Sequence, residues 1–376
     1  MIRKIMIAAL ATLLLASVIV SLHALPVSRG AHGAAAPTPD APWTFAVSGD
    51  SRNCGDVVVP AIAQQAKELE VQFYWHLGDL RAIYKMDEDL VNAEEHEGKT
   101  LKKGEYWSMA WKDFTHYQLD AFAPLPVYLG IGNHEVISPK SRGAFVNEFS
   151  KLPNAPWVSN PNEKYDFSDP TALTRYHWRR GAVEFIYLDN ATKDQFDDKQ
   201  VAWFEKILAD DDADNAVHTV VVGMHEALPD SLAAGHSMNI SRQETESGRR
   251  VYLDLLQWRE KTKKRVYVLA SHSHFFMEDI FNSSQWQAYR EEFGPVLPGW
   301  IVGTAGAVRY ALPPDAKYAK QAITNVYGFL LGRVNEDGEI QFDFQPIAEK
   351  DVPPATASRF SPAFVNWCFA ENSEAR

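Results

Sequence analysis

Five apolar segments of the sequence each end in side chains that can bind a metal ion. They read TFAVSGD (44–50), QFYWHLGD (72–79), PVYLGIGNHE (126–135), HTVVVGMHE (218–226) and RVYVLASHSH (265–274). Short apolar runs bounded by polar residues are typical of buried strands. Because ligands bind beyond the carboxyl ends of strands in open α/β sheets, we expect these polar ends to converge on one site.

The segments between these runs indicate the fold class. Two further apolar runs, at 183–190 and 299–306, also predict strands, and helical spacing is found at 57–70, 197–211 and 248–261. Alternation of strands and helices favours an α/β architecture. Strands that are apolar almost throughout predict a sheet covered on both faces.

The chain of 376 residues is long enough for one large folded domain with terminal extensions. Arg3 and Lys4 precede an uncharged apolar run at 5–22, which is typical of a secretory signal but long enough to stay as a membrane anchor. Both alternatives export the rest of the chain, as a periplasmic, secreted or outward-facing anchored protein. The expected boundaries are 1–25 for the signal peptide or anchor, 26–42 for a Pro/Ala linker, 43–350 for the domain with an insertion at 81–123, and 351–376 for a C-terminal tail.

Charge and cysteine content limit the partners and the compartment. The formal net charge of −12 provides no field that attracts long nucleic acid, so none is expected as a partner. A membrane partner is expected only through the N-terminal anchor, and the oligomeric state is left open. Cys54 and Cys368 are the two cysteines. In an exported protein we favour a disulfide between them over two free thiols.

The polar strand ends form a mixed set of oxygen and nitrogen ligands. Carboxylate oxygen together with neutral imidazole nitrogen suits Zn, Mn or Fe. Each group alone has an ordinary interpretation, since Gly-Asp after a strand is usually a turn and a lone histidine is usually structural. The ordered set predicts a metal site, in which a carboxylate shared by two ions would hold them roughly 3.5–4 Å apart.

From Thr44 to Gly306 the sequence resembles the calcineurin-like metallophosphoesterases. The resemblance depends on GD at 49–50, GD at 78–79, GNHE at 132–135, GMHE at 223–226 and SHSH at 271–274. The last motif usually begins with glycine, so Ser271 is a departure. The resemblance implies a four-layer α/β/β/α sandwich with its metal site at the carboxyl ends of the strands.

The resemblance also implies the role of each site residue. Asp50 and His274 would bind the first ion, Asp79 would bridge two ions, and Asn133, His225 and His272 would complete the second site. His134 would act at the scissile bond, and Glu135 would orient its ring. The expected reaction is hydrolysis of a small phosphomonoester or phosphodiester, with a metal-bound hydroxide as the nucleophile.

Arg52 stands where the family usually has a second ligand of the first ion, most often histidine. A guanidinium has no acceptor lone pair and cannot bind a cation. Three readings stay open. The first ion is bound weakly, or Arg52 replaces it and grips the phosphate as a catalytic residue, or Arg52 pairs with an acid such as Asp56.

Two other functions are a serine esterase and a non-catalytic binding protein. GDS at 49–51 resembles the GDSL-type esterases, with Ser51 as the nucleophile, and DFTH at 113–116 offers the one attractive base. That reading leaves the histidines of the later strand ends unused. A non-catalytic phosphate- or metal-binding protein of this fold would not need the retained pair His134 and Glu135.

Overall fold

The computed structural model describes residues 41–152, 155, 173–192 and 195–374. The chain divides into two units, 1–38 and 39–376, and all described residues belong to the second. The expected signal or anchor and most of the linker lie outside the described residues. Within the described part, no helix has the length and apolar character needed to cross a membrane.

Two sheets form the centre of the second unit. The first has the strand order β12-β11-β1-β2-β3. Its strands are β1 (Trp43–Ser48), β2 (Tyr74–His76), β3 (Val127–Leu129), β11 (Tyr327–Val334) and β12 (Ile340–Ile347). The second has the order β10-β8-β9-β7-β6-β5-β4. Its strands are β4 (Tyr176–Arg180), β5 (Val183–Leu188), β6 (Thr219–Met224), β7 (Arg265–Ala270), β8 (Phe276–Glu278), β9 (Gly299–Val302) and β10 (Gln321–Ile323).

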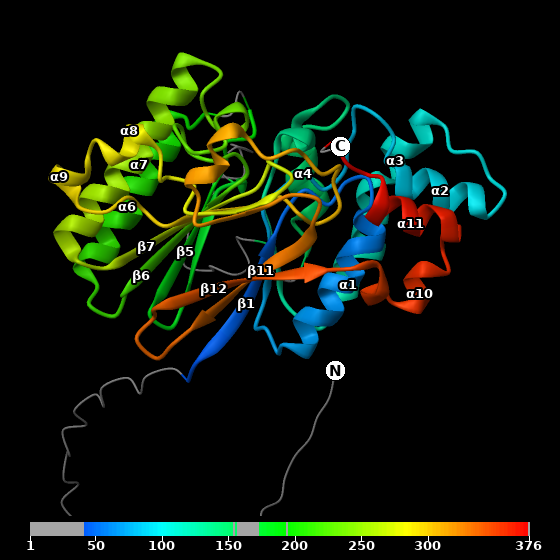
Figure 1. The fold of residues 1–376 in the computed structure, drawn as a ribbon, viewed down its shortest axis with the longest axis horizontal. Helices are drawn as coiled ribbons and strands as arrows, with labels where there is room; N and C mark the ends of the chain where they lie inside the picture. The colour runs from blue at the N-terminus through cyan, green and yellow to red at the C-terminus, as the bar shows by residue number, and fades with distance from the viewer. Residues whose placement is uncertain (1–40, 153–154, 156–172, 193–194, 375–376) are drawn as a thin grey trace, which may run out of the picture. The chain divides into compact units, whose positions relative to one another are not determined.

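The sheets pack face to face, and helices cover their outer faces. Aromatic and branched side chains of both sheets meet between them, including Phe45, Trp75 and Phe185. Helix α1 (Gly55–Glu68) lies outside the first sheet, and α6 (Asp198–Ala213) and α7 (Arg242–Thr262) lie outside the second (Figure 1). This arrangement confirms the four-layer α/β/β/α sandwich, because apolar strands bury one face against the other sheet and the other face against helices.

The parallel strands bring the polar ends together. In the first sheet β1, β2 and β3 run parallel, and in the second β5, β6, β7 and β9 run parallel. All of the strands expected from the apolar runs are present. Their carboxyl ends lie where the two sheets meet, since Gly49 N after β1 bonds to Val302 O of β9 in the other sheet. Within the second sheet, Ser271 N after β7 bonds to His225 O after β6.

The remaining helices flank this core. They are α2 (Glu88–His96), α3 (Lys103–Phe114), α4 (Arg142–Phe149), α8 (Ser284–Gln287), α9 (Arg290–Phe293), α10 (Pro354–Ala357) and α11 (Pro362–Ala370). Helices α2 and α3 belong to the insertion at 81–123. In the C-terminal segment, Phe364 and Val365 are buried against the α1 side of the first sheet. A disulfide joins Cys368 to Cys54 with a Cα–Cα distance of 5.9 Å, which confirms the favoured pairing.

Candidate metal centre

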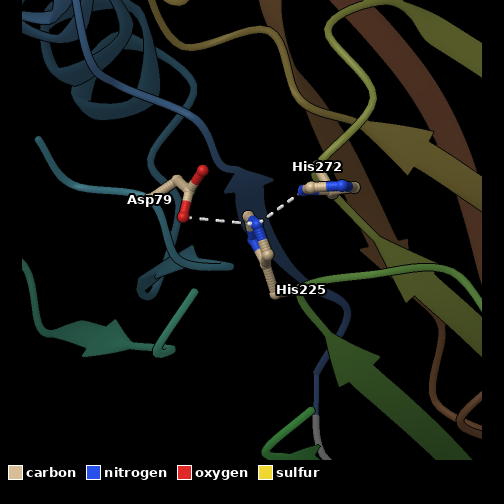
Figure 2. A group of neighbouring side chains, drawn as sticks. All are labelled: Asp79, His225 and His272. Carbon is tan, nitrogen blue, oxygen red and sulfur yellow. Dashed lines mark hydrogen bonds and ion pairs between the residues drawn. The ribbon is translucent and has the colours of Figure 1, made fainter. Parts of the chain in front are cut away.

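Asp79, His225 and His272 place their ligand atoms in one cluster at the strand ends (Figure 2). One atom from each residue lies within 4.8 Å of the other two. His225 Nε2 is 3.3 Å from Asp79 Oδ1 and 3.1 Å from His272 Nδ1, and Figure 2 shows the His225 ring between the other two side chains. Asn133 Oδ1 lies 3.0 Å from the same nitrogen. The structure thus brings together the four residues that the resemblance assigns to the second ion and the bridge.

The contact of His225 Nδ1 determines which tautomer the neutral ring adopts. Nδ1 lies 3.0 Å from the carbonyl oxygen of Leu77, which only accepts, so Nδ1 donates and the neutral ring presents a lone pair at Nε2. Such a backbone contact is a usual way of orienting a metal-binding histidine. Burial lowers the pKa of His225, but the Asp79 carboxylate outweighs it and raises the pKa to about 10, so a cation bound at Nε2 would displace a proton from that nitrogen. Carboxylate, amide oxygen and two imidazoles converge here, and this donor set fits Zn, Mn or Fe.

Three of the expected ligands have an unusual backbone conformation. Asp50 and Asp79 have φ of 60°, and His272 has φ of 64°. The left-handed region costs about 1–3 kcal/mol for such residues and persists only where the surroundings enforce it. Close backbone packing is part of that enforcement, because a Cβ added to Gly132 would lie 2.9 Å from His225 Cε1 and closer still to Asp79.

Glu135 holds two of the strand ends together. Its carboxylate accepts hydrogen bonds from the backbone nitrogens of Gly132 at 2.8 Å, Asp79 at 2.9 Å and Leu80 at 2.9 Å. The expectation that Glu135 orients the His134 ring differs from these contacts, because the carboxylate is used by backbone donors. Burial and the nearby Asp79 raise the pKa of Glu135 to about 8, and the three donors oppose that rise.

His134 is oriented by the insertion. Its Nδ1 donates to the carbonyl oxygen of Ala82 at 2.5 Å, and its backbone nitrogen donates to Asp79 Oδ1 at 3.0 Å. Nε2 therefore faces Asp79 Oδ2 at 3.5 Å. Burial lowers the pKa of His134, while Asp79 opposes that shift. The His134 side chain is 7% exposed, so a small part of it reaches solvent.

Arg52 lies among the residues expected to hold the first ion. Its Nη2 is 2.8 Å from His274 Nε2, and its Nε is 3.7 Å from Asp79 Oδ2. Asp50 Oδ1 lies 3.1 Å from the same His274 nitrogen. Of the acids with which Arg52 was expected to pair, Asp79 is its neighbour and Asp56 is not. Asp56 is buried and pairs with Arg81 at 2.6 Å and with Arg359 at 3.4 Å.

No protein-family model and no curated protein matches the sequence. Among solved structures, the chain is similar to a purple acid phosphatase from yellow lupin seeds, with 16% identity, a TM-score of 0.54, and coverage of 83% of this chain and 52% of the lupin chain. The chain has the calcineurin-like metallophosphoesterase fold. It spans about half the length of the lupin enzyme.

Two other solved structures are similar to a lesser degree. PhoD has 15% identity and a TM-score of 0.49, with 83% of this chain and 73% of PhoD covered. The NAD nucleotidase of Haemophilus influenzae has 10% identity and a TM-score of 0.40, with 81% of this chain and 50% of the nucleotidase covered.

Within this metallophosphoesterase fold, Ser271 contributes a contact that the usual glycine could not make. Its hydroxyl donates to Asp50 Oδ2, and the backbone nitrogen of His272 donates to the same oxygen at 2.7 Å. Ser271 is completely buried. The serine therefore adds a second protein donor to a carboxylate that the resemblance assigns to the first ion.

Aromatic side chains without a predicted role in the site surround the candidate metal centre. Tyr310 stacks on His274 with ring centroids 4.0 Å apart, and His236 stacks on Tyr310 at 5.0 Å. Tyr84 is 51% exposed and lies 5.2 Å from the His134 ring. These contacts join residues far apart in sequence, and no spacing pattern announces them.

Proposed function

We propose that the chain is a metal-dependent phosphoric ester hydrolase that acts on a small phosphomonoester or phosphodiester. The observation that carries this proposal is the convergence of His225 Nε2 with ligand atoms of Asp79, Asn133 and His272 next to the His134 ring. A site that only stores metal needs no second, partly open imidazole beside it. Asp79, Asn133, His225 and His272 would hold the ion.

An ion at this position would activate water and withdraw negative charge from the phosphoryl oxygens. In the hydrolysis, water adds its oxygen to phosphorus while the bond from phosphorus to the leaving oxygen breaks. The proton that the leaving oxygen needs would come from Nε2 of protonated His134, because Nδ1 is held by Ala82. Burial lowers the pKa of His134, so lower pH favours this protonated form. The surplus proton of the attacking water passes to solvent, and solvent reprotonates His134.

The position of His134 suits this role. Its Nε2 lies 3.5 Å from Asp79 Oδ2, and the other oxygen of that carboxylate lies 3.3 Å from His225 Nε2, so His134 stands beside the group of residues that would hold the ion. A phosphoryl group bound at the ion would therefore place its leaving oxygen near His134. Tyr84, exposed over that ring, would contact the leaving group.

The exported location belongs to the same proposal. The disulfide between Cys54 and Cys368 supports it, because such bonds persist in oxidising compartments. A small substrate also agrees with the net charge of −12, which disfavours long nucleic acid.

The contacts of Ser51 disfavour the esterase alternative. Ser51 is completely buried, and its hydroxyl donates to the Leu80 carbonyl at 3.4 Å. The DFTH candidates are engaged elsewhere, because Asp113 pairs with Arg81 and His116 lies exposed beside Asp120. In the described part of the chain, no imidazole is within hydrogen-bond reach of Ser51 to activate it.

The proposal is tested by measuring the turnover of 4-nitrophenyl phosphate and of bis(4-nitrophenyl) phosphate. Each is measured before chelation, after chelation, and after Mn²⁺, Zn²⁺ or Fe²⁺ has been added back. We expect activity that chelation removes and metal restores. Asp79→Asn should lose both bound metal and turnover, while the matched control Asp120→Asn, on the exposed surface, should keep both. Turnover that survives chelation, or metal binding without any turnover, would contradict the proposed function.

A further inference from the structure

The first-ion position of this fold contains a positively charged side chain. Asp50, Asp79 and His274 are the residues expected there, and the Arg52 guanidinium lies within 4 Å of two of them. Arg52 is 5% exposed. A guanidinium stays protonated at every working pH and cannot donate an electron pair to a cation. A cation bound among these groups would face the charge of Arg52 directly.

The lone pair of His274 is already used. Its Nδ1 donates to the Val308 carbonyl oxygen at 2.7 Å, so the neutral ring has its acceptor at Nε2. Arg52 Nη2 donates to that nitrogen at 2.8 Å. The atom that would bind the first ion therefore accepts a hydrogen bond from the guanidinium.

Protein donors also engage Asp50. One oxygen accepts from the Ser271 hydroxyl and from the His272 backbone nitrogen, and the other lies 3.1 Å from His274 Nε2. One oxygen of this buried carboxylate thus already has two protein donors before any ion binds.

The two carboxylate oxygens of Asp79 face different groups, one the His225 ring and the other the Arg52 guanidinium. Oδ1 faces His225 at 3.3 Å, and Oδ2 lies 3.7 Å from Arg52 Nε. Neither Oδ2 nor Arg52 Nε has a hydrogen-bond partner among the described residues. The carboxylate thus stands between the expected ion and the guanidinium. The N–H at Arg52 Nε is a buried donor, which an oxygen atom of a bound ligand would satisfy.

We infer that this protein holds a single metal ion, and that the guanidinium of Arg52 takes the place of the first ion of the fold and binds a phosphoryl oxygen. Asp79 bridges the ion and the guanidinium rather than two ions. The planar fork suits this task, because it pairs with phosphate oxygens in fixed geometry. This inference rests on the proposed function.

Metal content distinguishes the two proposals. The purified full chain is saturated with Mn²⁺ or Zn²⁺ and passed through a desalting column, and elemental analysis then gives the metal bound per chain. Calorimetric titration with the same ions gives the number of sites and their affinity. We expect one tightly bound equivalent. Two tight equivalents would overturn the inference and leave the proposed function intact. An absence of bound metal would overturn both.

Substitution at Arg52 tests whether the guanidinium is the cause. Arg52→His supplies an imidazole at that position and should raise the content to two equivalents. Arg52→Lys keeps the charge and should retain one. Thermal melting confirms that each variant is folded. If Arg52→His is folded and still binds one ion, the inference is wrong. If this variant does not fold, the number of ions bound by the wild type still tests the inference.

Inorganic phosphate is the probe for the second half of the inference. We expect Arg52→Gln to bind one equivalent of Mn²⁺ like the wild type but to bind phosphate about tenfold or more weakly, since a charge-assisted hydrogen bond is lost. The control Arg142→Gln removes an arginine paired with Asp189 and should not change phosphate affinity. Unchanged affinity in Arg52→Gln would overturn the phosphate-binding role.

Discussion

The Glu135 carboxylate accepts a hydrogen bond from the backbone nitrogen of Asp79 at 2.9 Å. Two residues of adjacent strand ends are thereby joined through a side chain that does not itself face the metal cluster. The same carboxylate accepts from Gly132 and Leu80, so it fixes the loops that follow β2 and β3. The geometry of the cluster depends on this buried group.

Glu135→Ala should therefore destabilise the protein and reduce its metal content together. Three buried backbone N–H groups would lose their acceptor, and each unsatisfied group costs about 1–3 kcal/mol. Chemical denaturation and elemental analysis would measure the two effects. If the variant retained normal metal content and stability but lost turnover, Glu135 would act in the chemistry rather than as a positioning residue.

His134→Ala should keep its metal content and lose turnover. Its ring contacts a backbone carbonyl and one edge of Asp79 and is not among the four converging donors, so metal content should stay the same. Turnover should fall by about 10²–10⁴, the usual contribution of general acid–base catalysis. His116→Ala, an exposed histidine of the insertion, is the matched control. Equal activity in the two variants would remove the proposed role of His134.

Ser51→Ala separates the two enzyme classes. The hydroxyl makes one long contact, 3.4 Å to Leu80 O, so its loss should change phosphatase activity and stability little. A nucleophilic serine would behave differently, because its removal abolishes turnover. Assay of 4-nitrophenyl acetate together with 4-nitrophenyl phosphate gives the comparison, and complete inactivation of the variant would favour the esterase.

Removal of the disulfide should lower stability. Cys54 and Cys368 close a loop with a sequence separation of 314, and loss of a native bridge typically costs about 2–5 kcal/mol. Urea denaturation of the Cys54→Ser, Cys368→Ser double variant would measure the difference. Wild-type protein treated with reductant should show a similar loss. An unchanged unfolding midpoint in both samples would contradict the expected stabilisation.

The buried cluster around Arg81 should make stability depend on pH. Burial, with Asp56 next in importance, raises the pKa of Asp113 to about 8, whereas an unfolded aspartate ionises near 4. Folding therefore retains a proton on this carboxyl, so its stabilising contribution is full below about pH 4 and is lost as pH rises toward 8. The charged groups around it also include Asp89 and Arg359.

Asp113→Asn tests this dependence. The free energy of unfolding, measured by denaturation between pH 5 and 8, should decline less steeply with pH in the variant than in the wild type. The Asp120→Asn control changes an exposed carboxyl of the same insertion and should leave the slope unaltered. Identical slopes in wild type and Asp113→Asn would show that this carboxyl does not hold the proton.

The α/β class and the convergence of the site could be predicted from the sequence. The apolar runs ending in Asp50, Asp79, Asn133 and His225 predicted that these ends meet, because strand direction in a parallel sheet fixes where such ends lie. The four-layer sandwich was implied by the resemblance that these motifs carry. The departure at Arg52 was visible as a residue that cannot bind a cation.

The contacts that those residues make depend on the tertiary structure. Arg52 lies beside His274, 222 positions away, and the nearby Asp56 pairs with Arg81. Glu135 binds backbone nitrogens rather than the His134 ring next to it in sequence. Packing between distant segments sets these partners. A local sequence pattern does not determine which of several polar groups will pair with a given buried side chain.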